Sequence, residues 1–335
     1  MISAPDFWSH DTWLARALAP LSRGGAAITA RRVARPGWRA PVPVVCCGNA
    51  TVGGAGKTTL ALDLAHRLGT LGLAVHVLLR GHGGSAKGPR RVRHDDPASV
   101  TGDEAQLLAA VAPTWTGADR AASARAAIAA GAGVLLMDDG LQNPSLVKTL
   151  SLLTIDGATG FGNGRVLPAG PLREPAAIAA ARCQAAILIG RDLTGALARL
   201  PPELPVLRAH LQSGPEIARL SGHRVLAFAG LAIPAKFFAA LDRAGVDLAG
   251  TVAFPDHHPF TPRDLARLVD RAAASGAILA TTPKDAVRLP PAMRAQVVVV
   301  GVGLVWEEEA AIDALLRAIV LAPPAYSPRR DRIMP

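Results

Sequence analysis

The stretch that decides the fold is Cys46-Cys47-Gly48-Asn49-Ala50-Thr51-Val52-Gly53-Gly54-Ala55-Gly56-Lys57-Thr58-Thr59. An apolar run precedes it and a segment with helical periodicity follows, so the pattern predicts a strand, a glycine-rich loop and a helix. Backbone N–H groups of such a loop bind phosphate, a lysine adds a cation, and the next hydroxyl can ligate Mg²⁺. We therefore predict a nucleoside triphosphate site comprising Thr51, Val52, Gly53, Gly54, Ala55, Gly56, Lys57, Thr58 and Thr59.

This glycine-rich loop departs in one position from the strict motif G-x-x-x-x-G-K-[ST]. Thr51 stands where the first glycine belongs. A tight strand–helix turn without a ligand is the alternative interpretation. The Gly-Gly-Ala-Gly-Lys-Thr core lies between a predicted strand and a predicted helix, and this context favours phosphate binding.

Length and composition indicate more than one folding unit. The chain has 335 residues, half of them apolar, which fits roughly two domains with full cores. Strand-like and helix-like segments alternate, so we predict an α/β fold: a mainly parallel P-loop NTPase-type sheet flanked by helices, with a second, smaller α/β lobe. Pro201, Pro202 and Pro205 suggest the boundary. The expected units are an amphipathic segment (1–40), a P-loop domain (41–203), a C-terminal lobe (204–321) and a flexible tail (322–335).

The charge balance limits the class of partner. The formal net charge is +10, but there is no long Lys/Arg block and only one tyrosine, so nucleic acid is not favoured. Phosphorylated small molecules or an anionic membrane surface remain. The three cysteines lack metal or C-x-x-C spacing, which favours reduced thiols in a cytoplasmic compartment. No run of 18 apolar residues occurs, so a transmembrane helix is not expected.

The first 40 residues combine aromatic, aliphatic and basic side chains. Phe7, Trp8, Trp13, Leu14 and Leu18 can form a helical apolar stripe, and several arginines surround it. Such a segment can lie in a membrane interface, and it can equally be a helix packed on the domain core. The sequence leaves both alternatives open. Pro20 is expected to limit or kink the helix.

Two acidic motifs accompany the loop. Asp138-Asp139-Gly140 ends an apolar strand, and in a parallel sheet that end lines the ligand crevice, so either carboxylate can complete the Mg²⁺ site that Thr58 begins. A simple turn is the alternative. Asp103 and Glu104 open a helix, where capping alone would explain them.

Two further loops carry candidate functional groups. His257 follows Asp256 in a turn framed by prolines and aromatic residues, which fits either a general-base pair or a structural loop histidine. The segment from Gly162 to Pro175 is rich in glycine and proline, and its Arg173 could hold a phosphate bidentately.

Taken together and in this order, the motifs resemble those of the tetraacyldisaccharide 4′-kinase (lipid A 4′-kinase) family of Gram-negative bacteria. The motifs that carry the resemblance are the P-loop, Arg80-Gly81, Gly102-Asp103-Glu104, Asp138-Asp139-Gly140-Leu141-Gln142, Gly162 to Pro175, Ala229-Gly230 with Pro234 and Phe237-Phe238, Asp256-His257, and Thr282 to Asp285. The resemblance implies transfer of a phosphoryl group from ATP, with Mg²⁺, to the 4′-hydroxyl of a lipid A disaccharide 1-phosphate precursor, giving lipid IVA. It also implies peripheral attachment to the anionic cytoplasmic face of the inner membrane.

The resemblance assigns roles residue by residue. The catalytic pair falls on Asp103, expected to accept the hydroxyl proton, and His257, expected to orient it. Metal ligands are expected among Thr58, Asp138, Asp139 and Glu104, and substrate contacts among Asn49, Arg80, Gly170, Arg173 and Glu174. Thr59, His82 and Asn143 replace the proline, tyrosine and histidine usual in the family, so their roles stay open.

Two rival interpretations belong to other functional classes. One is a P-loop switch ATPase or GTPase; the lysine typical of that loop is replaced by Val52, and Thr282-Pro283-Lys284-Asp285 has the wrong spacing for guanine recognition. The other is a non-catalytic, membrane-associated nucleotide-binding module. The intact pair of Asp103 and His257 argues against that module.

Overall fold

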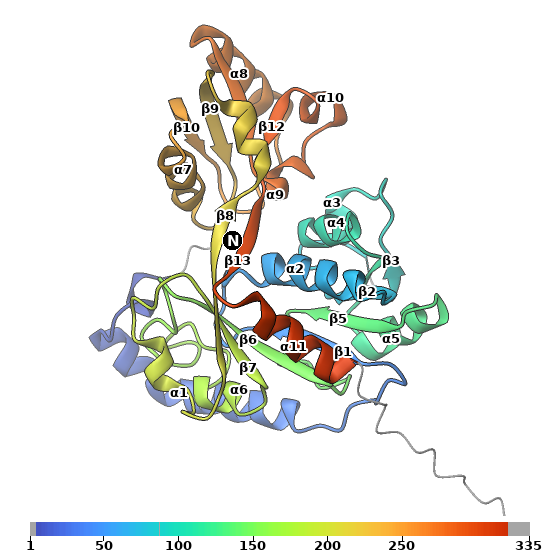
Figure 1. The fold of residues 1–335 in the computed structure, drawn as a ribbon. Helices are drawn as coiled ribbons and strands as arrows, with labels where there is room; N and C mark the ends of the chain where they lie inside the picture. The colour runs from blue at the N-terminus through green and yellow to red at the C-terminus, as the bar shows by residue number, and fades with distance from the viewer. Residues whose placement is uncertain (1–4, 87, 321–335) are drawn as a thin grey trace, which may run out of the picture.

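The structure is a computed structural model that describes residues 5–86 and 88–320. The tail predicted to be flexible, 322–335, lies outside the described residues. The chain forms two sheets, and strands β8 (Val206–Ser213) and β13 (Val302–Trp306) of the larger sheet lead to the smaller unit. Figure 1 shows the smaller unit attached to the larger one through these two strands.

The larger sheet has nine strands in the order β13-β8-β7-β6-β1-β5-β2-β4-β3. Their bounds are β1 (Val44–Gly48), β2 (Val75–Leu79), β3 (Arg90–Arg91), β4 (Thr114–Thr116), β5 (Val134–Asp138), β6 (Leu150–Asp156), β7 (Ala185–Ile189), β8 (Val206–Ser213) and β13 (Val302–Trp306). Only the two edge strands, β3 and β13, pair antiparallel. The predicted P-loop-type, mainly parallel sheet is confirmed, with β1 at its centre between β5 and β6.

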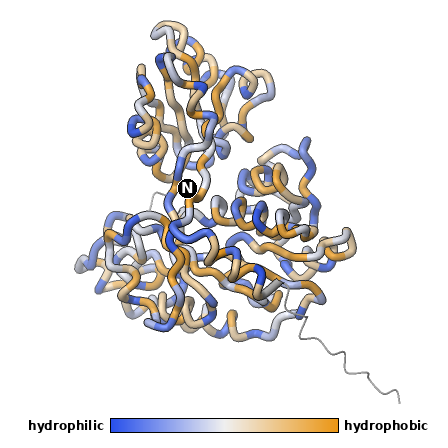
Figure 2. The backbone as a smooth tube through the Cα atoms, viewed as in Figure 1, coloured by the Kyte–Doolittle hydropathy of each residue, from blue (hydrophilic) through white to orange (hydrophobic). Residues whose placement is uncertain are grey.

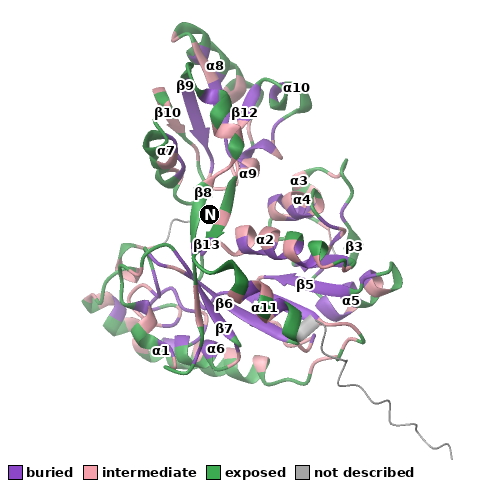
Figure 3. Cartoon of the chain, viewed as in Figure 1, coloured by how far each residue is buried: buried purple, intermediate pink, exposed green. Residues whose placement is uncertain are grey.

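Helices cover both faces of this sheet because the buried strands are apolar on both sides. One face packs on α2 (Lys57–Thr70), α4 (Asp103–Ala109) and α11 (Glu309–Val320). The other packs on α5 (Arg120–Ala129) and α6 (Ala176–Ala180). Figure 2 shows apolar runs along the central strands, and Figure 3 shows the same strands buried. The short segments are η1 (Asp6–Trp8), α3 (Ala98–Thr101) and η2 (Ala196–Arg199).

The small lobe, residues 214–301, contains a second parallel sheet in the order β10-β9-β11-β12. Its elements are η3 (Pro215–Leu220), β9 (Arg224–Ala229), α7 (Pro234–Arg243), β10 (Asp247–Ala253), α8 (Pro262–Ala274), β11 (Ala277–Thr281), α9 (Pro283–Ala286), α10 (Pro291–Arg294) and β12 (Val297–Val299). Separate apolar clusters lie on its two faces, one with α7 and the other with α8. The predicted smaller α/β lobe is therefore present.

The boundary predicted between residues 203 and 204 does not coincide with the change of sheet. The prolines at 201–205 lie in the connection from β7 to β8, and both strands pair in the large sheet. The chain returns through β13 to the same sheet, and Ile312 and Leu316 of α11 complete the core beneath the P-loop helix. The small lobe is thus an insertion between β8 and β13, and the C-terminal helix belongs to the large domain.

The amino-terminal helix α1 (Trp13–Val33) continues through Pro20 and does not end there, contrary to one of the two effects expected of this proline. Its inner side carries small residues: the buried Ser22 hydroxyl donates to the carbonyl of Val166 at 2.6 Å, and Gly25 lies against the Leu167 carbonyl. This side packs on the loop between β6 and α6. The large apolar side chains Trp13, Leu21 and Ile28 face outward, 79, 63 and 69% exposed.

Candidate active site

The P-loop, residues 51–59, takes its shape from two glycines in the left-handed region. Gly53 has φ 113° and Gly56 has φ 79°, and Gly56 caps helix α2, which begins at Lys57. At this positive φ an L side chain is strained, and a Cβ on Gly56 would also displace Ile189 Cδ1, which would lie 2.7 Å away, so glycine is favoured in this turn. Lys57 Nζ donates to Asn49 Oδ1 at 3.1 Å and to the Gly53 carbonyl at 3.2 Å. The lysine therefore lies folded over the loop that would hold phosphate.

The carboxylates at the end of β5 lie beside the first two residues of α2, Lys57 and Thr58. Thr58 Oγ1 donates to Asp138 Oδ2 at 3.2 Å. Burial, together with the charge of Asp139, raises the pKa of Asp138 to about 7. Burial opposes the charge of Asp139 too, but Lys57 and Arg173 outweigh it and lower the pKa of that carboxyl. The two carboxylates thus have different surroundings and opposite pKa shifts.

Asp139 and Arg173 form a bidentate ion pair. Arg173 donates to both carboxylate oxygens at 3.0 Å, and Asp139 adopts a left-handed backbone with φ 53°. Lys57 Nζ lies 3.9 Å from the same carboxylate. Asp139, predicted as a metal ligand, is engaged here by two cations, and Arg173, predicted to hold phosphate, is held beside the P-loop lysine.

Backbone hydrogen bonds join the loop before α6 to the P-loop. Val52 N–H donates to the Pro171 carbonyl at 2.8 Å, and Arg173 N–H donates to the Ala50 carbonyl at 2.7 Å. Glu174 is only 2% exposed, and Arg182 and Gln142 occupy its carboxylate. Gly170 packs so closely that a Cβ would meet Asn163 Oδ1 at 2.1 Å and the Arg165 carbonyl at 2.4 Å. In this structure Glu174 and Gly170, both predicted as substrate contacts, pack inside the loop before α6 and contact its own neighbours.

The predicted catalytic pair meets across the two units. Asp103, the first residue of α4, and His257, in the small lobe, are 154 positions apart, yet Nδ1 of the imidazole lies 2.8 Å from Asp103 Oδ2. Arg288 Nε lies 3.2 Å from the same oxygen. His257 has φ 58°, which marks a turn that the small lobe must hold in place. The prediction that the fold brings these residues together is confirmed.

Lys284 lies on the far side of this imidazole. Its ammonium is 3.1 Å from His257 Nε2, 3.1 Å from Glu104 Oε1 and 3.5 Å from Asp256 Oδ1. An ammonium only donates, so Nε2 is the acceptor, and we assign the imidazole proton to Nδ1, which donates to Asp103. Glu104, predicted as a metal ligand, is therefore paired with a lysine from the small lobe.

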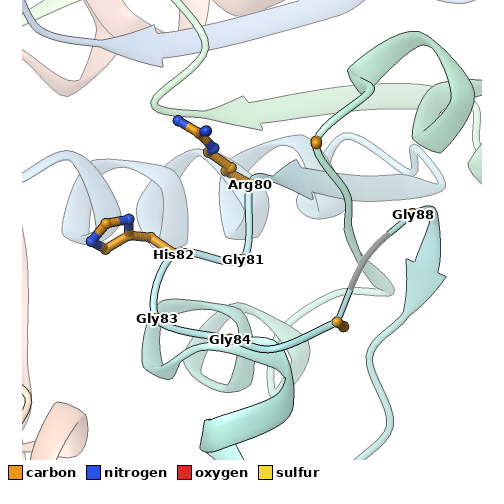
Figure 4. A pocket seen from close by; sticks show the side chains of 8 residues that line it. Arg80, Gly81, His82, Gly83, Gly84 and Gly88 are labelled. Atoms are coloured by element: carbon orange, nitrogen blue, oxygen red, sulfur yellow. The ribbon is translucent and has the colours of Figure 1, made fainter.

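A hollow of about 540 Å³ opens beside the loop that follows β2. Arg80, Gly81, His82, Gly83, Gly84, Ala86, Gly88 and Ala118 line it. Figure 4 shows that the Arg80 and His82 side chains project from this loop, while the glycines leave its inner side bare. The His82 ring lies 6.4 Å from the His257 ring, so the hollow adjoins the Asp103–His257 pair. Arg80 is the predicted substrate residue in this region.

Comparison with known proteins identifies the arrangement. A family model described as LpxK, tetraacyldisaccharide-1-P 4′-kinase, matches residues 14–320. A tetraacyldisaccharide 4′-kinase of Gluconacetobacter diazotrophicus is 58% identical over 318 residues, which are 93% of this chain and 97% of that protein. One of Rhodospirillum centenum is 51% identical over 331 residues, 95% of this chain and 97% of that protein.

The chain belongs to the tetraacyldisaccharide 4′-kinase family. The fold agrees with this membership: a crystal structure of LpxK from Aquifex aeolicus in complex with ATP is similar with a TM-score of 0.75 at 26% identity, covering 92% of this chain and 99% of that one. The resemblance inferred from the motifs is confirmed. Membership in this kinase family also decides against both rivals, the switch ATPase or GTPase and the non-catalytic module.

Two cations of this kinase site escaped prediction. Lys284 lies in the Thr282 to Asp285 motif that carries the resemblance, but the sequence predicted no site role for it or for Arg288. Both follow β11, where Thr282 caps α9 and Pro283 begins it. A strand that ends in a capped turn at the carboxyl edge of a parallel sheet is a signal that could have found them.

Proposed function

We propose that this kinase transfers the γ-phosphoryl group of ATP to the 4′-hydroxyl of tetraacyldisaccharide 1-phosphate, the lipid A precursor. The observation that carries the proposal is the contact between Asp103 and His257 at 2.8 Å, in a site that also holds the Lys57–Thr58 P-loop. A hydroxyl acceptor needs a proton acceptor beside the phosphate site, and this pair supplies one. The names and ligands of the related kinases support the choice of ATP and of the disaccharide.

The geometry supports a division of roles that reverses the one predicted from sequence. Asp103 Oδ2 is already engaged by the His257 N–H and by Arg288, and the carboxylate is less exposed than the imidazole, 7% against 20%. These two donors occupy the oxygen that would otherwise face an acceptor hydroxyl. Imidazole Nδ1 faces Asp103, so Nε2 points away from it and is the ring nitrogen that can accept a proton from a substrate hydroxyl. We assign proton acceptance to His257, and we assign to Asp103 the role of orienting the imidazole.

The triphosphate would lie over the P-loop, with Lys57 as its principal cation. Lys57 reaches the loop carbonyl of Gly53, so its ammonium already lies where β- and γ-phosphate oxygens bind in P-loop enzymes. Arg173 stands on the other side of Asp139 and is available to the nucleotide or to the sugar phosphate. Asn49 fixes Lys57, which gives this predicted substrate residue a place in the phosphate site.

The donor set fits Mg²⁺. Thr58 and the buried Asp138 lie in contact, and Asp138 and Asp139 are adjacent carboxylates whose negative charge a bound cation would offset. Within residues 5–86 and 88–320, no group of three or more His, Cys, Asp or Glu side chains could hold a metal ion. Mg²⁺ commonly binds to one or two protein oxygens plus phosphate oxygens, so this sparse set is sufficient. When bound, the ion would neutralise charge on the transferring phosphoryl group.

The decisive test is phosphorylation of the lipid itself. Purified protein with ATP, Mg²⁺ and disaccharide 1-phosphate in mixed micelles should yield a product heavier by one phosphate, measured by mass spectrometry. Omitting Mg²⁺ should abolish the gain, because Thr58 and Asp138 alone cannot orient the phosphates. Adding a chelator and then excess Mg²⁺ controls for damage to the protein. A product that lacks the added mass while ATP is consumed would contradict the assignment of the acceptor.

We further propose that α1 attaches the kinase to the anionic cytoplasmic face of the inner membrane as a peripheral protein. The outward side chains of Trp13, Leu21 and Ile28 stand on a helix whose last turn carries Arg31 and Arg32. Apolar anchors with arginines are typical of helices that lie in the interface of acidic membranes. Across the part of the chain that the structure describes, no helix is long and apolar enough to cross a bilayer.

Replacing Trp13, Leu21 and Ile28 together by serine should reduce binding to anionic vesicles by at least tenfold, because each buried apolar side chain contributes about 1.5–3 kcal/mol. Co-sedimentation with vesicles of acidic and neutral phospholipid measures this effect. The three side chains are exposed, so the variant should keep the melting temperature of the parent protein. As a matched control, Val111→Ser removes an exposed apolar group, 49% exposed, from outside α1. Unaltered vesicle binding in the folded triple variant would contradict the proposal.

A further inference from the structure

Lys284 occupies the one imidazole nitrogen that the reaction needs. Its ammonium lies 3.1 Å from His257 Nε2, while Nδ1 is committed to Asp103. A nitrogen that already accepts from an ammonium cannot take a proton from a sugar hydroxyl. In this conformation the proposed base is therefore capped, and Lys284 must leave before phosphoryl transfer.

Hydrogen bonds hold the backbone at Lys284 in place, so the lysine leaves His257 Nε2 by a movement of its side chain alone. Asp285 is fully buried and accepts from Gly230 N–H at 2.8 Å, from the Thr282 hydroxyl at 2.6 Å and from Arg288 at 2.7 Å. These bonds anchor α9 to the small lobe. The Lys284 side chain is 22% exposed and flexible, and a lysine ammonium can exchange partners by rotating its own bonds.

The neighbours of Lys284 lead toward the phosphate site. Its second partner is Glu104, at 3.1 Å. Glu104 lies in the first turn of α4, and α4 packs in the same apolar cluster as α2, the helix that begins with Lys57 and Thr58. Asp138 contacts Thr58 of the P-loop at 3.2 Å. Lys284 is thus paired with the helix that packs beside α2, at whose first residues the metal and γ-phosphate would bind.

We propose that Lys284 is a catalytic residue that exchanges His257 Nε2 for the γ-phosphate of bound ATP. A γ-phosphate carries formal negative charge, whereas imidazole is neutral, so arrival of the nucleotide favours the exchange. The exchange does two things at once: it frees Nε2 to accept the 4′-hydroxyl proton, and it adds a cation from the small lobe to the transferring phosphoryl group. This inference rests on the proposed function and names a further residue for it.

No proton is lost from Lys284 in this step. The ammonium keeps its three protons and changes acceptors, Nε2 then takes the hydroxyl proton, and the sugar oxygen attacks phosphorus as the bond to ADP breaks. The arrangement also gives a reason for placing the base and the cation on the same lobe. When a nucleotide occupies the P-loop, one movement of Lys284 frees His257 Nε2 for the sugar hydroxyl and brings the ammonium to the γ-phosphate. Without nucleotide the base stays capped.

The test compares Lys284→Met with Lys284→Arg. The Met variant should lower kcat by about 10²-fold, as expected for removal of one group that stabilises transition-state charge, while the dissociation constant for ATP changes far less. Arg keeps the charge and should recover part of kcat. Lys236→Met is the matched control: this lysine also bridges the two units, to Asp156 at 2.6 Å, and lies outside the catalytic pair, so it should keep normal kcat. Normal kcat in Lys284→Met would overturn the proposal.

A second measurement does not depend on the lipid. With ¹⁵N-labelled histidine, the Nε2 resonance of His257 should shift when the non-hydrolysable analogue AMP-PNP and Mg²⁺ are added, because Nε2 loses its donor. In Lys284→Met the same resonance should begin at the uncapped position and stay there. An Nε2 signal that AMP-PNP leaves unchanged in the parent protein would refute the exchange. If the signal shifts but the disaccharide gains no phosphate, the proposed function fails and the exchange stands.

Discussion

Lys57→Ala should lower kcat for lipid phosphorylation by about 10³-fold, which corresponds to about 4 kcal/mol in the barrier. Phosphoryl transfer depends on positioning and on compensation of charge, and Lys57 serves both. Its ammonium is fixed by Asn49 and by the Gly53 carbonyl directly over the P-loop. Steady-state kinetics with saturating lipid would measure the loss.

Lys57 also supports the neighbouring carboxylates, so its loss extends beyond one phosphate contact. It lies 3.9 Å from Asp139 and lowers the pKa of that group. Lys57→Arg is the informative control: it keeps the charge but not the compact geometry that fits between Asn49 and Gly53, so we expect only partial recovery. Near-normal kcat in folded Lys57→Ala would contradict the nucleotide site, since no other feature of the sequence indicates phosphate binding as directly.

The sequence predicted local features well. The P-loop is a continuous segment whose strand, glycines and lysine are neighbours in the chain, so its pattern carries its structure. The strands β1, β5, β6 and β7 are apolar and buried on both faces, which makes them visible as uninterrupted runs. The position of Asp138 followed from the rule that parallel strands end at the ligand crevice.

The sequence was less informative where structure depends on distant partners. Strand β8 is largely exposed and carries no apolar run that would predict a strand, so the junction of the small lobe was placed at the prolines that precede it. The resemblance places Glu174 among the substrate contacts, but no pattern in the sequence predicts that Arg182, eight positions further along the chain, holds its buried carboxylate. Lys284 acquires its role only because the fold carries it beside His257 and Glu104. Hydrophobic periodicity reports local structure and does not indicate contacts between residues that are distant in the chain.

Removal of Asp103 and His257 should reveal that the two act as one unit. Each alanine variant should lower kcat by about 10²–10⁴-fold, the usual contribution of a positioned general base. Without His257 the proton acceptor is gone, and without Asp103 the imidazole loses the bond at 2.8 Å that orients it. ATP binding should be largely retained in both variants, because neither residue belongs to the P-loop. Equilibrium titration with AMP-PNP checks this point.

The double variant Asp103→Ala/His257→Ala decides between a unit and two independent residues. If the imidazole works only while Asp103 holds it, the double variant should be little slower than the slower single variant. His258→Gln is the matched control, since His258 forms a similar pair, 3.0 Å from Asp264, entirely within the small lobe. It should leave kcat unchanged. Losses that multiply in the double variant would show separate roles and refute the pair, whereas near-normal kcat in either single variant would remove that residue from the mechanism.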